Sequence, residues 1–116
     1  MLAFLKDEGV GVLARGALAK GLLAGKPPAP FLNYSAEDVE KAALSMRSVS
    51  GDRNLPSDTA IHFVLDHSAI SSAVIGIRTE TQLWEAVSAG NSPTLNRIQM
   101  EGLKKSIQPN QYTEHR

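Results

Sequence analysis

The chain has 116 residues, of which 12 are basic and 12 acidic, and it contains no cysteine. This composition is that of one ordinary domain, and it excludes disulfides and thiolate metal sites. A formal charge of zero offers no long-range attraction to a phosphate backbone or an anionic membrane, so we expect no nucleic-acid and no membrane partner. The apolar first residues give way to charged residues 6–8, too soon for a signal peptide, and we expect a cytoplasmic protein.

The first part of the chain is predicted to pass from a helix through a strand into a proline-rich segment. Residues 2–8 are typical of the last turns of a helix that ends at Gly9. Apolar and small residues then fill positions 10–14 without polar alternation, which predicts a parallel strand buried on both faces. Three prolines in residues 26–33 exclude a helix interior or a central strand, so this segment is expected to lie extended on the surface.

Two helices are predicted next. Ser35 and Asp38 nearly form a capping box, and the apolar residues after them recur with the period of a surface helix: Val39, Ala42, Ala43 and Met46. The polar residues 48–54 predict a loop. Pro56 then opens a helix over residues 58–67, with an expected apolar face of Ile61, Val64 and Leu65, broadened by Ala60 and Phe63.

The last part is predicted to contain a strand, a tight turn and two helices. Residues 71–77 are the second strand candidate, and Thr79 with Gln82 fits a capping box for a helix that stops at Gly90. The final helix is expected over residues 94–107, with an apolar face of Leu95, Ile98, Leu103 and Ile107, and residues 108–116 form a polar tail.

Strands that alternate with helices predict an α/β fold in which helices cover a parallel sheet. The pattern contains only two strands, however. Such a pair has two unpaired edges, and it is marginally stable by itself. The sequence therefore indicates part of a larger sheet.

Most short motifs in the chain carry little chemistry. Residues 9–14 spell GxGxxA, but they lie within the predicted strand rather than after it, and residues 21–26 match a P-loop imperfectly. His62, His67 and His115 are too scattered for a metal site and are expected on the surface or at helix ends. The sequence has no nucleophile motif either, so we assign neither catalytic nor metal-binding residues.

The turn over residues 76–82 is the better candidate site. Gly76 lets the backbone approach a ligand, Arg78 supplies a cation, and the amides of residues 79–81 begin a helix whose N-terminus attracts anions. Glu80 opposes an anion at this position. These residues fit a phosphate site, and they also fit an ordinary capped helix.

Two stretches together resemble the aldo/keto reductase family. Residues 9–26, GVGVLARGALAKGLLAGK, are similar to that family's seventh barrel strand and the loop after it, and residues 74–89, VIGIRTETQLWEAVSA, to its eighth strand and following helix. The resemblance implies the C-terminal part of a (β/α)8 barrel, with the last two strands and helices in residues 1–107. It accounts for the incomplete sheet, and barrels of this type often hold phosphate after strands seven and eight.

The resemblance also implies a site for NADP(H), the nicotinamide dinucleotide of this family. The implied cofactor-binding residues are Arg15, Gly16, Ala17, Leu18, Gly21, Lys26, Gly76, Arg78, Thr79, Gln82 and Glu85. Those of the first stretch would face the pyrophosphate and nicotinamide, and those of the second the adenosine end. Arg15 stands where the family often has an aromatic residue, Gly16 and Ala17 replace Ser-Pro, Ile75 replaces Pro, and Ala86 replaces Asn.

The family's catalytic Asp, Tyr, Lys and His lie on earlier strands that this sequence lacks, and Tyr34 and Tyr112 have no partnered Lys. We therefore expect a C-terminal segment of an NADPH-dependent carbonyl reductase that binds cofactor, is inactive by itself, and is completed by an N-terminal barrel segment. One alternative is an inactive remnant that associates with itself or another chain through its open strand edges. Another is a small helical protein in which the turn is coincidental.

Overall fold

The structure is a computed structural model, and it describes residues 1–51 and 55–106. The elements follow one another as α1 (Leu2–Asp7), β1 (Val12–Arg15), the 3-10 helix η1 (Ala19–Ala24), α2 (Ala36–Ser50), α3 (Pro56–Leu65), β2 (Ile70–Val74), α4 (Glu80–Asn91) and α5 (Arg97–Lys104). Strands and helices alternate along the chain, as predicted. The tail predicted for residues 108–116 and the apolar position Ile107 lie outside the described residues.

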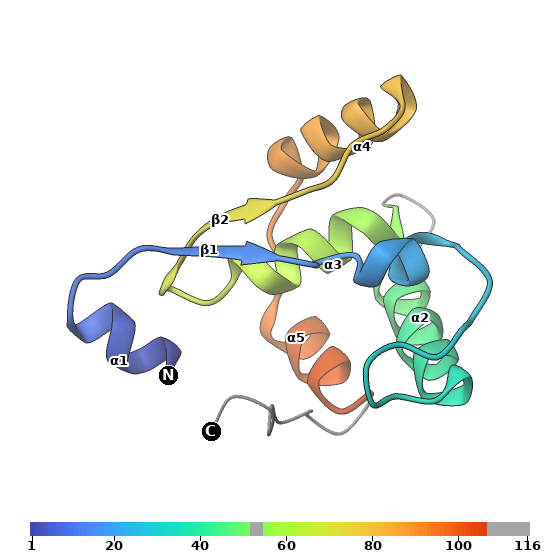
Figure 1. Cartoon of the computed structure of the whole chain (residues 1–116), viewed down its shortest axis with the longest axis horizontal. Helices are drawn as coiled ribbons and strands as arrows, with labels where there is room; N and C mark the ends of the chain where they lie inside the picture. Colours follow the sequence, from blue (N-terminus) through green and yellow to red (C-terminus); the bar gives the residue numbers. More distant parts are fainter. Residues whose placement is uncertain (52–54, 107–116) are drawn as a thin grey trace.

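The two strands form a parallel pair, which confirms the predicted sheet. Val12 lies opposite Ile70 and Arg15 opposite Val74, so both strands end at the same edge of the sheet. Helix α3 lies alongside the pair and connects directly to β2 (Figure 1). The chain segments that follow β1 and β2 therefore start next to each other.

The prediction that the first strand is buried on both faces is wrong for this chain. β1 alternates half-buried and exposed residues, and Leu13 is 68% exposed. The reason is that the sheet has two strands within the described residues, so no third strand flanks β1 and no helix covers the face that carries Leu13. An apolar strand without covering layers is what remains when a sheet is incomplete.

The hydrophobic core lies among the helices instead of under the sheet. It is centred on Met46 of α2, Ala60 of α3 and Leu103 of α5, and the half-buried Leu18, Leu23, Val49, Phe63 and Leu95 pack against it. The capping box that starts α2 is confirmed, since Ser35 Oγ accepts from the Asp38 amide at 3.2 Å and Asp38 Oδ2 accepts from the Ser35 amide at 3.3 Å. The predicted stripe of α2 is buried as expected.

Several predicted boundaries of α2 and α3 need correction. α2 continues to Ser50, so the first residues of the predicted loop are helical. Ser50 Oγ donates to the Met46 carbonyl at 2.6 Å and also bonds Thr59 Oγ1, which holds this last turn against α3. α3 ends at Leu65, which is exposed, and the helix buries residues 57–62 all round instead of one stripe. The cause is its position, since α2, η1, β2 and α4 all contact it.

The ends of α4 and α5 also differ from the prediction. α4 runs through Gly90 to Asn91, and Gly90 does not adopt the left-handed conformation expected of a stop. α5 begins at Arg97, after a capping box between Asn96 and Gln99, and the predicted apolar position Ile98 is 82% exposed.

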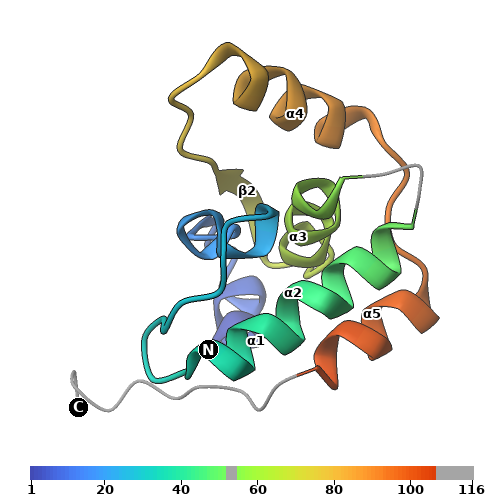
Figure 2. The same cartoon turned by 90° about the vertical axis from the view of Figure 1, so that its right-hand side faces the viewer.

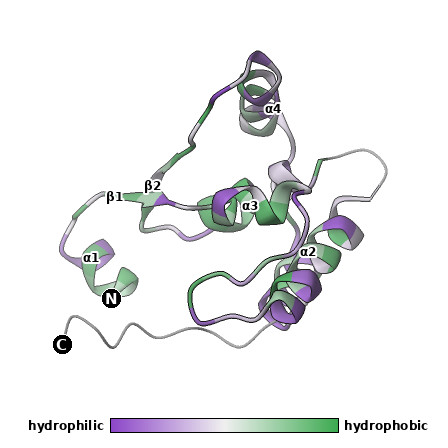
Figure 3. Cartoon of the chain, turned by 45° about the vertical axis from the view of Figure 1, so that its right-hand side comes forward, coloured by the Kyte–Doolittle hydropathy of each residue, from purple (hydrophilic) through white to green (hydrophobic). Residues whose placement is uncertain are grey.

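Helix α4 lies at the edge of the molecule (Figures 1, 2 and 3). It contacts α3, but only Ala89 of its residues is buried. Its exposed apolar residues are Leu83, Trp84 and Val87. None of the helices in the described residues has both the length and the apolar character needed to cross a membrane.

Candidate functional site

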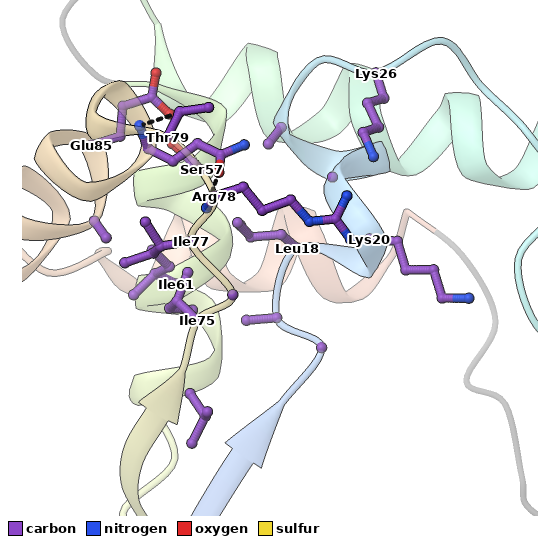
Figure 4. A pocket seen from close by; sticks show the side chains of 18 residues that line it. Leu18, Lys20, Lys26, Ser57, Ile61, Ile75, Ile77, Arg78, Thr79 and Glu85 are labelled. Atoms are coloured by element: carbon purple, nitrogen blue, oxygen red, sulfur yellow. Dashed lines mark hydrogen bonds between the residues drawn. The ribbon is translucent and has the colours of Figure 1, made fainter.

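A cleft of about 860 Å³ lies between the segment that follows β1 and the segment that follows β2. One wall comes from η1 and the residues before it, the other from residues 74–79 and the first turns of α4, and Ser57 and Ile61 of α3 form part of the lining (Figure 4). The parallel pairing of β1 and β2 brings these two segments together, although they are about 60 residues apart in sequence.

Ten of the eleven sequence-predicted cofactor residues line this one cleft: Gly16, Ala17, Leu18, Gly21, Lys26, Gly76, Arg78, Thr79, Gln82 and Glu85. The eleventh, Arg15, is exposed at the end of β1 and does not line it, because alternate side chains of a strand point to opposite faces. The structure thus brings together the two stretches that sequence analysis singled out, and it leaves Arg15 outside.

The wall that follows β1 is shaped by left-handed backbone. Gly16 (φ 75°) and Gly21 (φ 92°) adopt conformations that favour glycine. Ala19 (φ 47°) and Lys20 (φ 58°) adopt positive φ without that freedom, so the turn carries strain of the kind found at binding sites. A Cβ on Gly21 would lie 3.1 Å from the side chain of Lys26, so these two residues are packed closely together.

The opposite wall is the capped start of α4. Thr79 Oγ1 accepts a hydrogen bond from the Gln82 amide at 3.2 Å, and Gln82 Oε1 accepts one from the Arg78 amide at 2.8 Å. One of the two hydrogen bonds of the predicted capping box is therefore present, from the Gln82 amide to Thr79 Oγ1. The other is replaced, because the side chain of Gln82 accepts from the amide of Arg78 instead of that of Thr79. These two bonds fix the backbone from which the Arg78 side chain extends toward η1 (Figure 4).

The lining of the cleft is cationic on balance. Lys26 and Arg78 face a single carboxylate, Glu85, and Lys20 lines the cleft with its stem, while the whole chain has no net charge. The macrodipole of α4 adds partial positive charge at the same place. Lys20, whose ammonium points outward, was missed by sequence reasoning, as were Ser57 and Ile61 (Figure 4). Only the fold shows that α3 passes beside the two loops.

The histidines behave differently from one another. His67 lies just after α3, where its Nδ1 accepts from the Ala69 amide at 3.1 Å, as expected for a helix-end residue. His62 corrects the prediction of a surface position: it is buried, and Nε2 lies 2.8 Å from Ser92 Oγ, which joins α3 to the end of α4. His115 lies outside the described residues.

A buried carboxyl lies one turn before His62. Asp58 is 5% exposed, and among the described residues its Oδ1 has no hydrogen-bond partner. Burial raises the pKa of Asp58 from 3.8, and the charge of His62 acts in the opposite direction. Asp58 does not line the cleft, so it takes no part in the candidate site.

The geometry is that of an α/β fold with a cleft at the ends of two parallel strands. Among solved structures, the holo form of the aldo-keto reductase AKR11C1 from Bacillus halodurans superposes with a TM-score of 0.86 at 23% identity over 98% of this chain. The apo form gives a TM-score of 0.82 at 22% identity over 97% of this chain. The predicted resemblance to the aldo/keto reductases is confirmed, and the chain has the fold of part of an aldo/keto reductase.

Two curated relatives agree. An uncharacterized oxidoreductase of Bacillus subtilis is 28% identical over 99% of this chain, and an L-galactose dehydrogenase of Arabidopsis thaliana is 32% identical over 77% of it. The chain spans 40% and 28% of these relatives, and 39% and 40% of the two solved structures. No family model matches the chain.

Proposed function

We propose that this chain is the C-terminal segment of an NADPH-dependent aldo/keto reductase and that its cleft holds the anionic end of the cofactor. One observation carries the proposal: two loops far apart in sequence, each of which resembles a cofactor loop of the family, meet in a single cleft whose lining includes Lys26 and Arg78 against one carboxylate, Glu85. The holo state of the Bacillus halodurans structure supports a bound group in this fold.

In this proposal Arg78 pairs with a phosphate, and the amides at the first turn of α4 assist it. A guanidinium binds phosphate through two parallel hydrogen bonds, and helix N-termini leave amides without intrahelical partners. Gly76 allows close approach of the dinucleotide, and Glu85 lies further along α4, where it would meet a ribose hydroxyl. When bound, the cofactor would supply hydride for reduction of a carbonyl group.

The chain alone is proposed to bind without catalysis. Carbonyl reduction needs a proton donor held at the substrate oxygen, and none of the residues that line the cleft supplies a phenol or imidazole. The donor would come from the part of the barrel that this chain does not span. The residues that select the substrate would therefore also lie in that part of the barrel. The expected cytoplasmic location stays a prediction.

The test is the stability of the full chain with added dinucleotide. NADPH at about 100 times its Kd should stabilise the fold by roughly 2.7 kcal/mol, measured from urea midpoints. Arg78→Ala should abolish the shift, while the matched control Arg47→Ala, an exposed arginine on α2 outside the cleft, should retain it. An equal shift in both variants would refute the phosphate assignment. A smaller shift with NADH would indicate that the additional phosphate is recognised.

A further inference from the structure

Arg15 is the sequence-predicted cofactor residue that lies outside the cleft, and its place in the sheet gives it a different role. It is the last residue of β1, and it pairs in register with Val74, the last residue of β2. Val74 lines the cleft. Neighbouring strands lie about 4.8 Å apart, so Arg15 is one strand spacing from the rim of the cleft.

The Arg15 side chain projects from the uncovered face of the sheet. Along β1, half-buried residues alternate with the exposed Leu13 and Arg15. Ala14, between these two, lies opposite Ala73 of β2. Ala73 lines a groove of about 450 Å³ under α4, which α4, α3 and β2 enclose. The helices therefore cover the face that carries Ala14, and Arg15 points to the other face.

The uncovered face corresponds to the interior of a barrel. In a (β/α)8 barrel the helices form an outer ring, so the face of each strand without helices points inward. The carboxyl ends of the strands form the mouth where such barrels carry their active sites. Arg15 is at the carboxyl end of β1 on the inward face, so its guanidinium would lie at the mouth, beside the cleft. This inference rests on the proposed function, because it places a substrate next to bound NADPH.

The described residues do not neutralise this guanidinium. Within residues 1–51 and 55–106 the side chain of Arg15 makes no ion pair and no hydrogen bond, whereas Arg97 pairs with Glu101. The nearby cleft wall adds the cations Lys26 and Arg78. A guanidinium stays charged at any physiological pH, and closure of a barrel around it is costly unless an anion meets it. Arg15 therefore requires an anionic partner.

We propose that this partner is the substrate and that Arg15 selects carbonyl compounds that carry a carboxylate. A residue at the carboxyl end of a barrel strand lies where ligands bind, and a guanidinium fork matches a carboxylate through two parallel hydrogen bonds. Reduction leaves this carboxylate unchanged, since the hydride of NADPH adds to the carbonyl carbon and a proton adds to its oxygen. Arg15 thus fixes the end of the substrate that does not react.

The test joins the full 116-residue chain to the part of the Bacillus subtilis relative that lies outside its match to this chain. Rates with NADPH are compared for p-carboxybenzaldehyde and its methyl ester, which share one carbonyl group and differ in charge. We expect kcat/KM to favour the acid at least tenfold. Arg15→Gln should remove this preference by raising KM for the acid alone, and Arg15→Lys should keep part of it. The matched control Arg47→Gln, an exposed arginine on α2, should keep all of it.

Two results would overturn the proposal. In the first, the fusion reduces both compounds equally well, or Arg15→Gln leaves the preference unchanged. In the second, Arg15→Gln lowers the urea midpoint of the fusion without changing the preference, which would assign Arg15 to an ion pair inside the barrel. NADPH binding is measured on every variant, so that a fusion that binds NADPH without preferring the acid refutes the role of Arg15 alone. Absence of NADPH binding would instead refute the proposed function.

A binding measurement decides the case in which the fusion is inactive. The side-chain N–H resonance of Arg15 is followed by NMR in the fusion, or in the full chain where the fusion does not fold, with NADPH present. Addition of p-carboxybenzaldehyde should shift this resonance until it saturates, and the methyl ester should not. A shift no larger than that of the Arg47 resonance would overturn the proposal.

Discussion

Two glycine substitutions distinguish the observed end of α4 from the end predicted by sequence. Gly90 lies inside α4, has no left-handed φ, and has no atom within 4 Å of the position that a Cβ would take. Alanine in a helix is more stable than glycine by about 0.5–1 kcal/mol, and a position near the helix end should give the lower value. We therefore expect Gly90→Ala to stabilise the protein by about 0.5 kcal/mol.

Gly51, just after α2, is the matched contrast. A Cβ there would also meet nothing within 4 Å, but the backbone has φ 63° and ψ −156°, a region that only glycine adopts readily. Gly51→Ala should destabilise by about 1–3 kcal/mol through backbone strain alone. The two alanine variants should thus shift stability in opposite directions.

The assay is urea denaturation of both variants and the parent chain, followed by far-UV circular dichroism. Fluorescence of Trp84 reports on α4 itself, because this tryptophan lies in the first half of that helix. A loss of stability in Gly90→Ala would refute the reasoning, since it would mean that Gly90 adopts the left-handed stop conformation after all. A neutral Gly51→Ala would contradict the strain assigned to the end of α2.

Three further results are expected. Leu103→Ala, in the core, should cost about 2–5 kcal/mol in urea denaturation, whereas Ile98→Ala on the same helix should cost under about 0.5 kcal/mol; equal costs would contradict a core between the helices. Burial raises the pKa of Asp58 in the folded chain above 3.8, so ionisation of this carboxyl destabilises the fold as pH rises. Asp58→Asn removes the titrating group, and the urea midpoint should then fall less between about pH 4 and 7 than it does in the parent chain. An unchanged fall of the midpoint would contradict this assignment. Gly76→Ala, with open space at its Cβ, should leave stability unchanged and weaken NADPH binding about tenfold or more in a titration; retained affinity would mean that no ligand approaches there.

The local features of the fold were predictable from the sequence because they depend on neighbouring residues. The capping box at Ser35 and the strand, turn and helix unit around Thr79 are satisfied by bonds over three or four positions. The parallel pairing of the strands was also predictable, since alternation of strands with helices leaves few other topologies. These features were sufficient to bring together the two stretches that line the cleft.

The missed features depend on packing that the sequence does not display. α3 is buried all round in its first half, because four elements contact it, so a single apolar stripe was the wrong expectation. His62 lies inside for the same reason, bonded to Ser92 thirty positions later. Leu13 is exposed for the opposite reason, a lack of packing partners. β1 has the composition of a buried strand, but within the described residues no third strand flanks it and no helix covers the face that carries Leu13.

The positions of the two hollows suggest how they influence each other. Ile75 and Ile77 line both the cationic cleft and the groove under α4, so the short connection from β2 to α4 separates one from the other. Arg78 and Thr79 follow directly and carry the proposed phosphate contacts. Only Ala89 of α4 is buried, and the helix is held by its contact with α3, where His62 Nε2 lies 2.8 Å from Ser92 Oγ. A ligand in the cleft and an apolar element in the groove would both act on this one connection, so occupancy of either hollow should change affinity at the other by the same factor.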